Sequence, residues 1–167
     1  MRITSLNLLY PPFAHRFLKG LRLAKQAGIP LEPFETYRTF ARQAELYAQG
    51  RTQPGKIVTR AKPGFSWHHY GMACDIVMRQ GNRFDWSNEN LYKQAGPYFE
   101  SVGLVWLGRA QKGKAFELAH FQLPCTQTIH EMARLHGSKG ILGVWQELDQ
   151  QWGDDHVWET EINASIS

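Results

Sequence analysis

The sequence predicts one domain that mixes helices with short strands. Its 167 residues, of which 43% are hydrophobic and 20% charged, are enough for a soluble domain with a real core. Residues 12–27 repeat apolar side chains every three or four positions, which is typical of an amphipathic helix. Residues 73–78 read instead as a short strand. No apolar run approaches the ~20 residues that span a bilayer, so we expect no membrane insertion.

The first half of the chain is predicted to alternate between helix and extended backbone. A helix over residues 12–27 should end at Gly28, because glycine is a common helix stop. Residues 29–38 contain two prolines, which exclude a helix interior, so extended backbone is expected there. Thr39 can then cap a second helix over residues 40–49.

A loop over residues 53–64 follows and is marked by two Pro-Gly pairs. It leads directly into a stretch that places a histidine, a glycine and an aspartate in front of an apolar run. We therefore expect this loop to form one wall of a cleft, since long ordered loops often carry function.

Asp75 lies within the apolar run that begins at Ala73. Side chains alternate along a strand, so Asp75 shares one face with Val77, and Cys74 points to the other face. A buried carboxylate is costly unless it is paired or binds a metal. His68 precedes a flexible glycine and could fold back onto the same point.

A second pair of polar residues lies in the stretch 116–123, which we interpret as the last strand. It contributes His120, with Glu117 three residues before it. Two histidines, an aspartate and a nearby glutamate suit a catalytic zinc: three protein ligands, an open position for water and a base beside that water. For any one of these residues alone, a hydrogen-bonded polar group in the core is the more common explanation.

The order of these residues makes the zinc interpretation specific. Ser-x-His-x-x-Gly-x-Ala-x-Asp runs without a gap from Ser66 to Asp75, and Glu-x-x-His runs from Glu117 to His120. Both motifs resemble those of the zinc D-alanyl-D-alanine carboxypeptidases and L-alanyl-D-glutamate endopeptidases, which cut bacterial cell-wall peptides. The resemblance covers about residues 8–124, and the predicted loop looks like that of the endopeptidase branch.

The resemblance implies an α+β fold: a small antiparallel sheet with helices packed on one side and a zinc site on the open face. It implies Zn²⁺ as the cofactor, with three ligands: His68, Asp75 and His120. Glu117 would be the general base, and Arg38, which follows an aromatic residue, would polarise the scissile amide or stabilise its oxyanion. Ser66 and Gln43 would bind substrate.

Three positions leave alternatives open. His69 is the nearest rival to His68 as a ligand, although the motif register favours His68. Cys74 could be a ligand by residue type, but the strand alternation points it away from the aspartate, so buried packing is its expected role. Ala119 occupies a position where the family often has proline, and this difference affects the backbone that positions His120.

The remaining elements are predicted from periodicity and glycines. They are a helix over 87–102, a strand at 104–106 and helices over 128–135 and 141–152, divided at Gly137. The last two helices should pack on the catalytic core. Residues 1–152 would then form a single zinc peptidase domain, and residues 153–167 a loosely ordered tail.

The charge distribution bears on partners. Net charge is +4, but residues 1–62 hold eleven Lys or Arg and three Asp or Glu, whereas residues 125–167 hold two basic and seven acidic residues. A basic half suits nucleic acid or a bacterial wall, although a solvated surface is the simpler explanation of charge alone. No nucleic-acid motif is present, so we expect no such partner. The two cysteines, Cys74 and Cys125, should be free thiols.

The implied function is an L-alanyl-D-glutamate endopeptidase of the phage lysin type, acting on peptidoglycan stem peptides. The N-terminus lacks the apolar stretch of a signal peptide. We therefore expect a protein that is made in the cytoplasm and reaches the wall after holin-type release. We also expect it to be a monomer. A D-Ala-D-Ala carboxypeptidase or dipeptidase is the alternative within this class. A wall-binding protein without turnover and a toxin delivered into rival cells are further alternatives.

Overall fold

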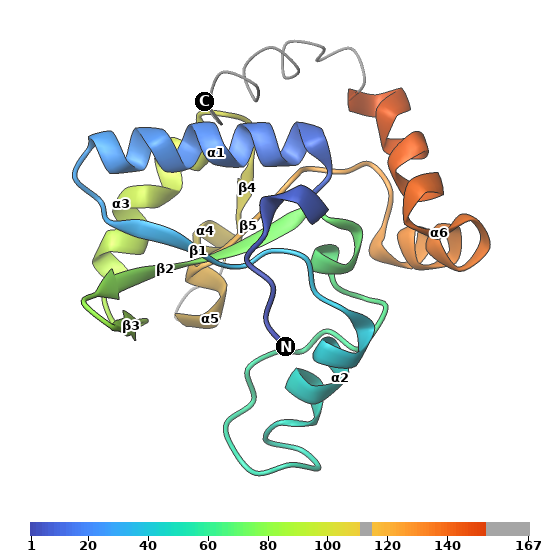
Figure 1. The fold of residues 1–167 in the computed structure, drawn as a ribbon, viewed down its shortest axis with the longest axis horizontal. Helices are drawn as coiled ribbons and strands as arrows, with labels where there is room; N and C mark the ends of the chain where they lie inside the picture. The colour runs from blue at the N-terminus through green and yellow to red at the C-terminus, as the bar shows by residue number, and fades with distance from the viewer. Residues whose placement is uncertain (111–114, 153–167) are drawn as a thin grey trace.

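The computed structural model describes residues 1–110 and 115–152, and it has the α+β architecture expected from the sequence. Its centre is an antiparallel sheet in the order β1-β2-β5-β4, with β3 paired to β2 (Figure 1). The strands are β1 (Leu31–Glu35), β2 (Ala73–Gln80), β3 (Arg83–Asp85), β4 (Val105–Trp106) and β5 (His120–Gln122).

Helices pack on the apolar face of this sheet. The helices of the fold are α1 (Pro11–Gln26), α2 (Phe40–Ala48), α3 (Glu89–Glu100), α4 (Leu107–Ala110), α5 (Ala115–Leu118) and α6 (Ile129–Trp152), with short 3-10 helices η1 (Leu6–Leu8) and η2 (Trp67–Tyr70). The first and third helices, α1 and α3, pack against each other (Figure 1). None of the helices in the described residues is long and apolar enough to cross a membrane.

The core lies between these helices and one face of β2. Cys74 is fully buried in this core, as are Ile76 and Met78, its neighbours on the same strand face. The ring of Phe99 on α3 joins the helices to the sheet, with its centroid 5.5 Å from Phe17 of α1 and 4.1 Å from Phe121 of β5. The predicted alternation along β2 is therefore confirmed, and it leaves Asp75 on the opposite face.

The predicted start of the second helix is confirmed by its cap. The hydroxyl of Thr39 accepts a hydrogen bond from the backbone N–H of Arg42 at 3.1 Å, which satisfies one of the free donors of the first turn of α2. The helix thus begins directly after the strand β1 and the short segment that carries Arg38.

The expectation of a continuous strand over residues 116–123 is wrong. The structure has the short helix α5, a turn at Ala119, and then β5. In one regular strand, residues three apart point to opposite faces, so Glu117 and His120 could not both face the same site. The helix and turn remove that conflict and are compatible with the helix-forming residues Ala, Glu and Leu.

The break in the C-terminal helical region lies three residues later than predicted. Gly140, with φ 67° and ψ −172°, interrupts α6, whereas Gly137 lies inside the helix. A left-handed φ is accessible to glycine without the steric cost that other residues incur, so either glycine could have divided the segment on sequence grounds. The strand β3 was also not predicted, because only three residues form it.

The last helix packs on the rest of the fold through polar as well as apolar contacts. The indole N–H of Trp145 donates to the carbonyl of Tyr70 at 2.9 Å, and the hydroxyl of Tyr10 donates to Asp149 at 2.7 Å. Leu148 is fully buried in the common core. These contacts support our proposal that residues 1–152 form a single domain. The tail predicted for residues 153–167 lies outside the described residues.

Candidate metal centre

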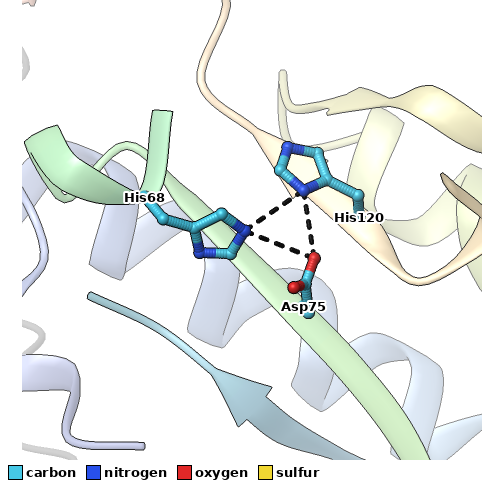
Figure 2. Close-up of side chains that lie close together, drawn as sticks. All are labelled: His68, Asp75 and His120. Atoms are coloured by element: carbon cyan, nitrogen blue, oxygen red, sulfur yellow. Dashed lines mark hydrogen bonds and ion pairs between the residues drawn. The ribbon is translucent and has the colours of Figure 1, made fainter. Parts of the chain in front are cut away.

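Three side chains from separate elements converge on the open face of the sheet (Figure 2). Nε2 of His68 lies 3.3 Å from Nδ1 of His120 and 3.4 Å from Oδ1 of Asp75. The third distance, from His120 Nδ1 to Asp75 Oδ1, is 3.0 Å. Ligand atoms bound tetrahedrally to zinc at 2.0–2.1 Å are separated by roughly 3.3 Å. The three atoms therefore have the spacing that a zinc ion requires.

Local backbone structure brings these residues together. Strand pairing places Asp75 of β2 directly opposite His120 of β5. His68 lies on η2, which ends at Gly71 with φ 69°. A Cβ at this glycine would come within 2.8 Å of the carbonyl oxygen of Leu8, so only glycine permits both the turn and this close approach.

Each metal-facing side chain is oriented by a second hydrogen bond. Nδ1 of His68 lies 2.6 Å from the carbonyl of Thr36, and because a carbonyl only accepts, Nδ1 carries the proton and Nε2 is free to bind a metal. Nε2 of His120 lies 3.2 Å from the amide oxygen of Gln122, which leaves Nδ1 free in the same way. These partners, Thr36 and Gln122, were not identified from the sequence.

The protonation states also suit a metal. Burial lowers the pKa of His68, which favours the neutral imidazole. Burial alone would raise the pKa of the Asp75 carboxyl, but its interactions with His68 and His120 outweigh this and hold the pKa well below its usual range. A neutral histidine and an ionised aspartate are the forms that bind zinc.

Glu117 lies in the same cleft as the three ligand residues. It is carried by α5, and its Oε2 atom is buried with no hydrogen-bond partner among the described residues. A buried carboxylate oxygen without a partner is costly in a folded protein, and such groups are concentrated at functional sites. Glu117 is therefore free to accept a proton from a molecule bound in the cleft.

The cleft is large and open along the sheet. Its volume is ≈ 980 Å³, at the upper end of the range of about 300–1,000 Å³ for small-molecule sites. Residues 56–61 of the predicted loop line it, which confirms the expected wall. The volume exceeds what a single amino acid needs, so the site can hold an extended substrate.

The family model for "VanY: D-alanyl-D-alanine carboxypeptidase" matches residues 7–121, more than half of the chain. The chain belongs to the VanY family. Its matched segment includes all three metal-facing residues and Glu117.

Two similar proteins are described as L-alanyl-D-glutamate endopeptidases. CwlK of Bacillus subtilis, a peptidoglycan L-alanyl-D-glutamate endopeptidase, is 46% identical over 57 residues, which span 34% of this chain and 34% of CwlK. The crystal structure of ChiX, an L-Ala D-Glu endopeptidase of Serratia marcescens, superposes with a TM-score of 0.53 at 23% identity, covering 74% of this chain and 90% of ChiX.

A second solved structure holds a metal. It is a D,D-pentapeptidase VanY from a vancomycin resistance cassette in complex with Zn(II), with a TM-score of 0.51 at 16% identity, covering 73% of this chain and 76% of that one. At these identities the two structural matches establish the fold alone.

Arg38 in this VanY-family chain belongs to a buried network. Its Nη2 donates to Oδ2 of Asp75 at 2.8 Å, its Nε donates to Glu35 at 2.8 Å, and its Nη1 donates to the amide oxygen of Gln43 at 3.0 Å. The side chain of Arg38 is only 8% exposed, although it lines the cleft. The network leaves Oδ1 of Asp75 toward the metal position and orients the carboxylate. Glu35, which was not predicted from the sequence to be a site residue, holds this arginine in place through a hydrogen bond.

Gln43 and Ser66 are placed differently with respect to substrate. Gln43 is fully buried, and its amide nitrogen donates to the carbonyl of Ala61 at 2.7 Å while its oxygen accepts from Arg38. It thus ties the cleft loop to the arginine, and a direct contact with substrate stays a prediction. Ser66 lines the cleft, and its hydroxyl does not cap η2, so it is available to a bound molecule.

His69 points away from the metal-facing group. Its Nδ1 lies 2.6 Å from the carbonyl of Arg38, and its ring stacks on Phe40 with centroids 4.3 Å apart. The side chain is fully buried, and burial lowers its pKa to about 4. The geometry therefore favours His68 as the ligand, in agreement with the motif register.

Proposed function

We propose that this chain is a zinc-dependent peptidoglycan peptidase that hydrolyses the L-alanyl-D-glutamate bond of stem peptides. The observation that carries the proposal is the metal-facing group itself. Three donor atoms stand 3.0–3.4 Å apart beside a buried, unpartnered carboxylate oxygen of Glu117, in a cleft large enough for a peptide. This set supplies three ligands and a base, which is the composition of a catalytic zinc site.

The residues divide the chemistry of hydrolysis among them. A zinc ion held by His68, Asp75 and His120 would supply a Lewis acid and an acidified water. Glu117 accepts a proton from the attacking water and returns it to the leaving amine nitrogen, so one carboxylate serves as base and then as acid. In this proposal Arg38 stabilises negative charge on the carbonyl oxygen and also holds Asp75 in place. Ser66 contacts the peptide backbone of the substrate.

The choice of bond rests on sequence likeness. Two observations support cleavage of the L-alanyl-D-glutamate bond. They are the 46% identical segment shared with CwlK and the sequence of the 53–64 loop. The description of the matched family model favours the alternative, a D-Ala-D-Ala carboxypeptidase. The intact set of metal-facing residues and Glu117 argues against a wall-binding protein without turnover.

Mass spectrometry of digested peptidoglycan tests the proposal. Purified sacculi are incubated with the zinc-loaded protein, and the soluble products are analysed. New D-glutamate amino termini on the released peptides support the proposed bond. Released D-alanine would instead assign the chain to the carboxypeptidase alternative, and unchanged sacculi would argue against peptidase activity on this wall.

The physiological setting is a further part of the proposal. We propose a phage endolysin that acts as a monomer on the wall after holin-type release; the resemblance of the loop to the L-alanyl-D-glutamate endopeptidase branch is compatible with this setting. Co-expression in a bacterial host is expected to cause lysis with a holin and not without one.

Removing Arg38 is expected to weaken the site through Asp75. Arg38→Ala deletes the hydrogen bond to Oδ2 and leaves the carboxylate free to rotate, and loss of such an orienting partner typically lowers metal affinity or activity about 10–100-fold. Zinc titration of the metal-free protein and steady-state kinetics measure the two effects. Arg42→Ala is the matched control, because Arg42 also binds Glu35 but makes no hydrogen bond to Asp75.

Two outcomes would change the role assigned to Arg38. If Arg38→Ala had the same zinc affinity and kcat as the wild type, Arg38 would not be needed to orient Asp75. A rise in KM alone, absent for carboxyl-amidated substrates, would move Arg38 from catalysis to recognition of a substrate carboxylate.

A further inference from the structure

A group of aromatic side chains stands in and beside the cleft and takes no part in the proposed chemistry. We refer to Phe34, Phe84 and Trp86 as the aromatic wall. The ring of Phe34 meets that of Trp86 at 85° with centroids 4.5 Å apart, and meets that of Phe84 at 88° and 5.3 Å. The guanidinium of Arg2 lies 4.1 Å from the centroid of Phe34 and 4.8 Å from that of Phe84. Edge-to-face packing and the cation therefore hold the rings in a defined orientation.

Two rings of the wall remain exposed to solvent. Trp86 and Phe84 are each 41% exposed. Trp86 lines the cleft together with the metal-facing residues, whereas Phe84 lies outside the cleft lining. A large ring left exposed beside a binding cleft indicates a surface that another molecule covers.

Strand register places the wall close to the metal-facing group. Glu35, which follows Phe34, pairs with Asp75, and Asp85, which precedes Trp86, pairs with Met78. The wall therefore runs beside β2 from Asp75 to Met78. These positions are three residues apart, which is roughly 10 Å at about 3.3 Å per residue.

The cleft lining also includes cationic side chains. Lys56 and Arg60 line the cleft from the loop that joins α2 to η2. In Figure 1 this loop hangs below α2, while β3, which leads to Trp86, lies at the left end of β2. The cleft lining thus combines aromatic, cationic and metal-facing residues, and its aromatic and cationic members come from different segments of the chain.

The proposed substrate has a sugar on one side of the cleaved bond and an acidic residue on the other. Its stem peptide is attached through L-alanine to the lactyl group of an N-acetylmuramic acid ring, and its D-glutamate carries a free carboxylate. One residue, about 3.5 Å long, and the short lactyl arm separate the L-alanyl-D-glutamate bond from the sugar ring. A sugar bound to the enzyme would therefore lie within roughly 10 Å of the cleaved bond, the distance spanned by the aromatic wall.

We propose that Trp86 and Phe34 form a saccharide subsite that binds the muramic acid ring to which the stem peptide is attached. This inference rests on the proposed function, since it assigns the sugar side of the same substrate. The stem peptide offers small or charged side chains, so it has no large apolar group to cover Trp86. A pyranose ring does offer such a surface, because its axial C–H groups form an apolar face that packs on indole. Lys56 and Arg60 would then face the acidic peptide on the other side of the cleaved bond.

Matched substrates and a matched control variant test the subsite. The wild type, Trp86→Ala and Phe84→Ala are compared on a disaccharide-tetrapeptide and on the free tetrapeptide of the same sequence, with new D-glutamate amino termini as the readout. For Trp86→Ala we expect KM on the sugar-bearing substrate to rise about three- to tenfold with kcat little changed, and KM on the free peptide to stay as in the wild type. Phe84→Ala loses similar packing on Phe34 but removes no ring from the cleft lining, so its effect on KM for the sugar-bearing substrate should be much smaller than that of Trp86→Ala.

The outcomes separate this inference from the proposed function. Equal effects of Trp86→Ala on both substrates, or no effect on either, would overturn the saccharide subsite while leaving the endopeptidase assignment intact. A wild type that releases D-alanine instead would contradict the proposed function. In that case saturation-transfer NMR with the peptide-free disaccharide still decides the subsite: signals present in the wild type and lost in Trp86→Ala support it, and signals absent from the wild type refute it.

Discussion

Replacing His68 with alanine is expected to abolish zinc binding and to reduce peptidase activity to background. The variant removes one of three donor atoms that stand 3.0–3.4 Å apart, and no described residue next to it can take its place: His69 points to the carbonyl of Arg38. A metal ion typically contributes several kcal/mol of transition-state stabilisation, so the loss in rate should be at least ~10³-fold. Metal analysis after dialysis should find about one zinc per wild-type chain and almost none in the variant.

The adjacent histidine is the control for this experiment. His69→Ala removes a buried ring of the same kind from the same 3-10 helix, yet it should retain zinc. Full occupancy in His68→Ala together with loss in His69→Ala would reverse the ligand assignment. Thermal melting adds a readout independent of activity, because a ligand that binds only the folded state raises Tm. Zinc should raise the Tm of the wild type and of His69→Ala, but not that of His68→Ala.

Glu117→Gln is expected to keep zinc and the fold while losing ~10²- to 10⁴-fold in kcat, the usual contribution of a general base. Glutamine has nearly the same shape but cannot accept the proton of the attacking water. Because Oε2 of Glu117 has no hydrogen-bond partner among the described residues, replacing that oxygen with an amide nitrogen breaks no hydrogen bond to it. Kinetics on muropeptides, zinc content and Tm should all be measured on one preparation.

A glutamate outside the cleft provides the comparison. Glu45, on α2, has a 60% exposed side chain and pairs with Arg42, so Glu45→Gln should leave kcat unchanged. Near wild-type hydrolysis by Glu117→Gln would show that another group is the base. Loss of zinc from Glu117→Gln would instead make Glu117 a ligand. Together with the His68 variant, this experiment separates metal binding from proton transfer.

Local sequence was sufficient for the parts of the site that depend on neighbouring residues. Alternation along the strand separated Asp75 from Cys74, and the motif register favoured His68 over His69. The cap at Thr39 was predictable for the same reason, since a hydroxyl three residues before a free backbone N–H acts over a single turn. The prediction of a strand at Glu117 was wrong because the four-residue helix α5 and the turn after it are too short to give a periodic pattern in the sequence.

The sequence by itself therefore identified the metal-facing residues, through motifs that resemble those of a known family, and it predicted the order of most elements through local periodicity. Only the tertiary structure decided how those residues are held. Arg38 reaches Asp75 across 37 positions of the chain, and the ring of His68 is oriented by a carbonyl 32 positions away. Such contacts follow from the register between β1 and β2 and from the packing of η2, which sum many weak interactions over the whole fold. The same register sets Phe34 and Trp86 side by side, although 52 residues separate them along the chain.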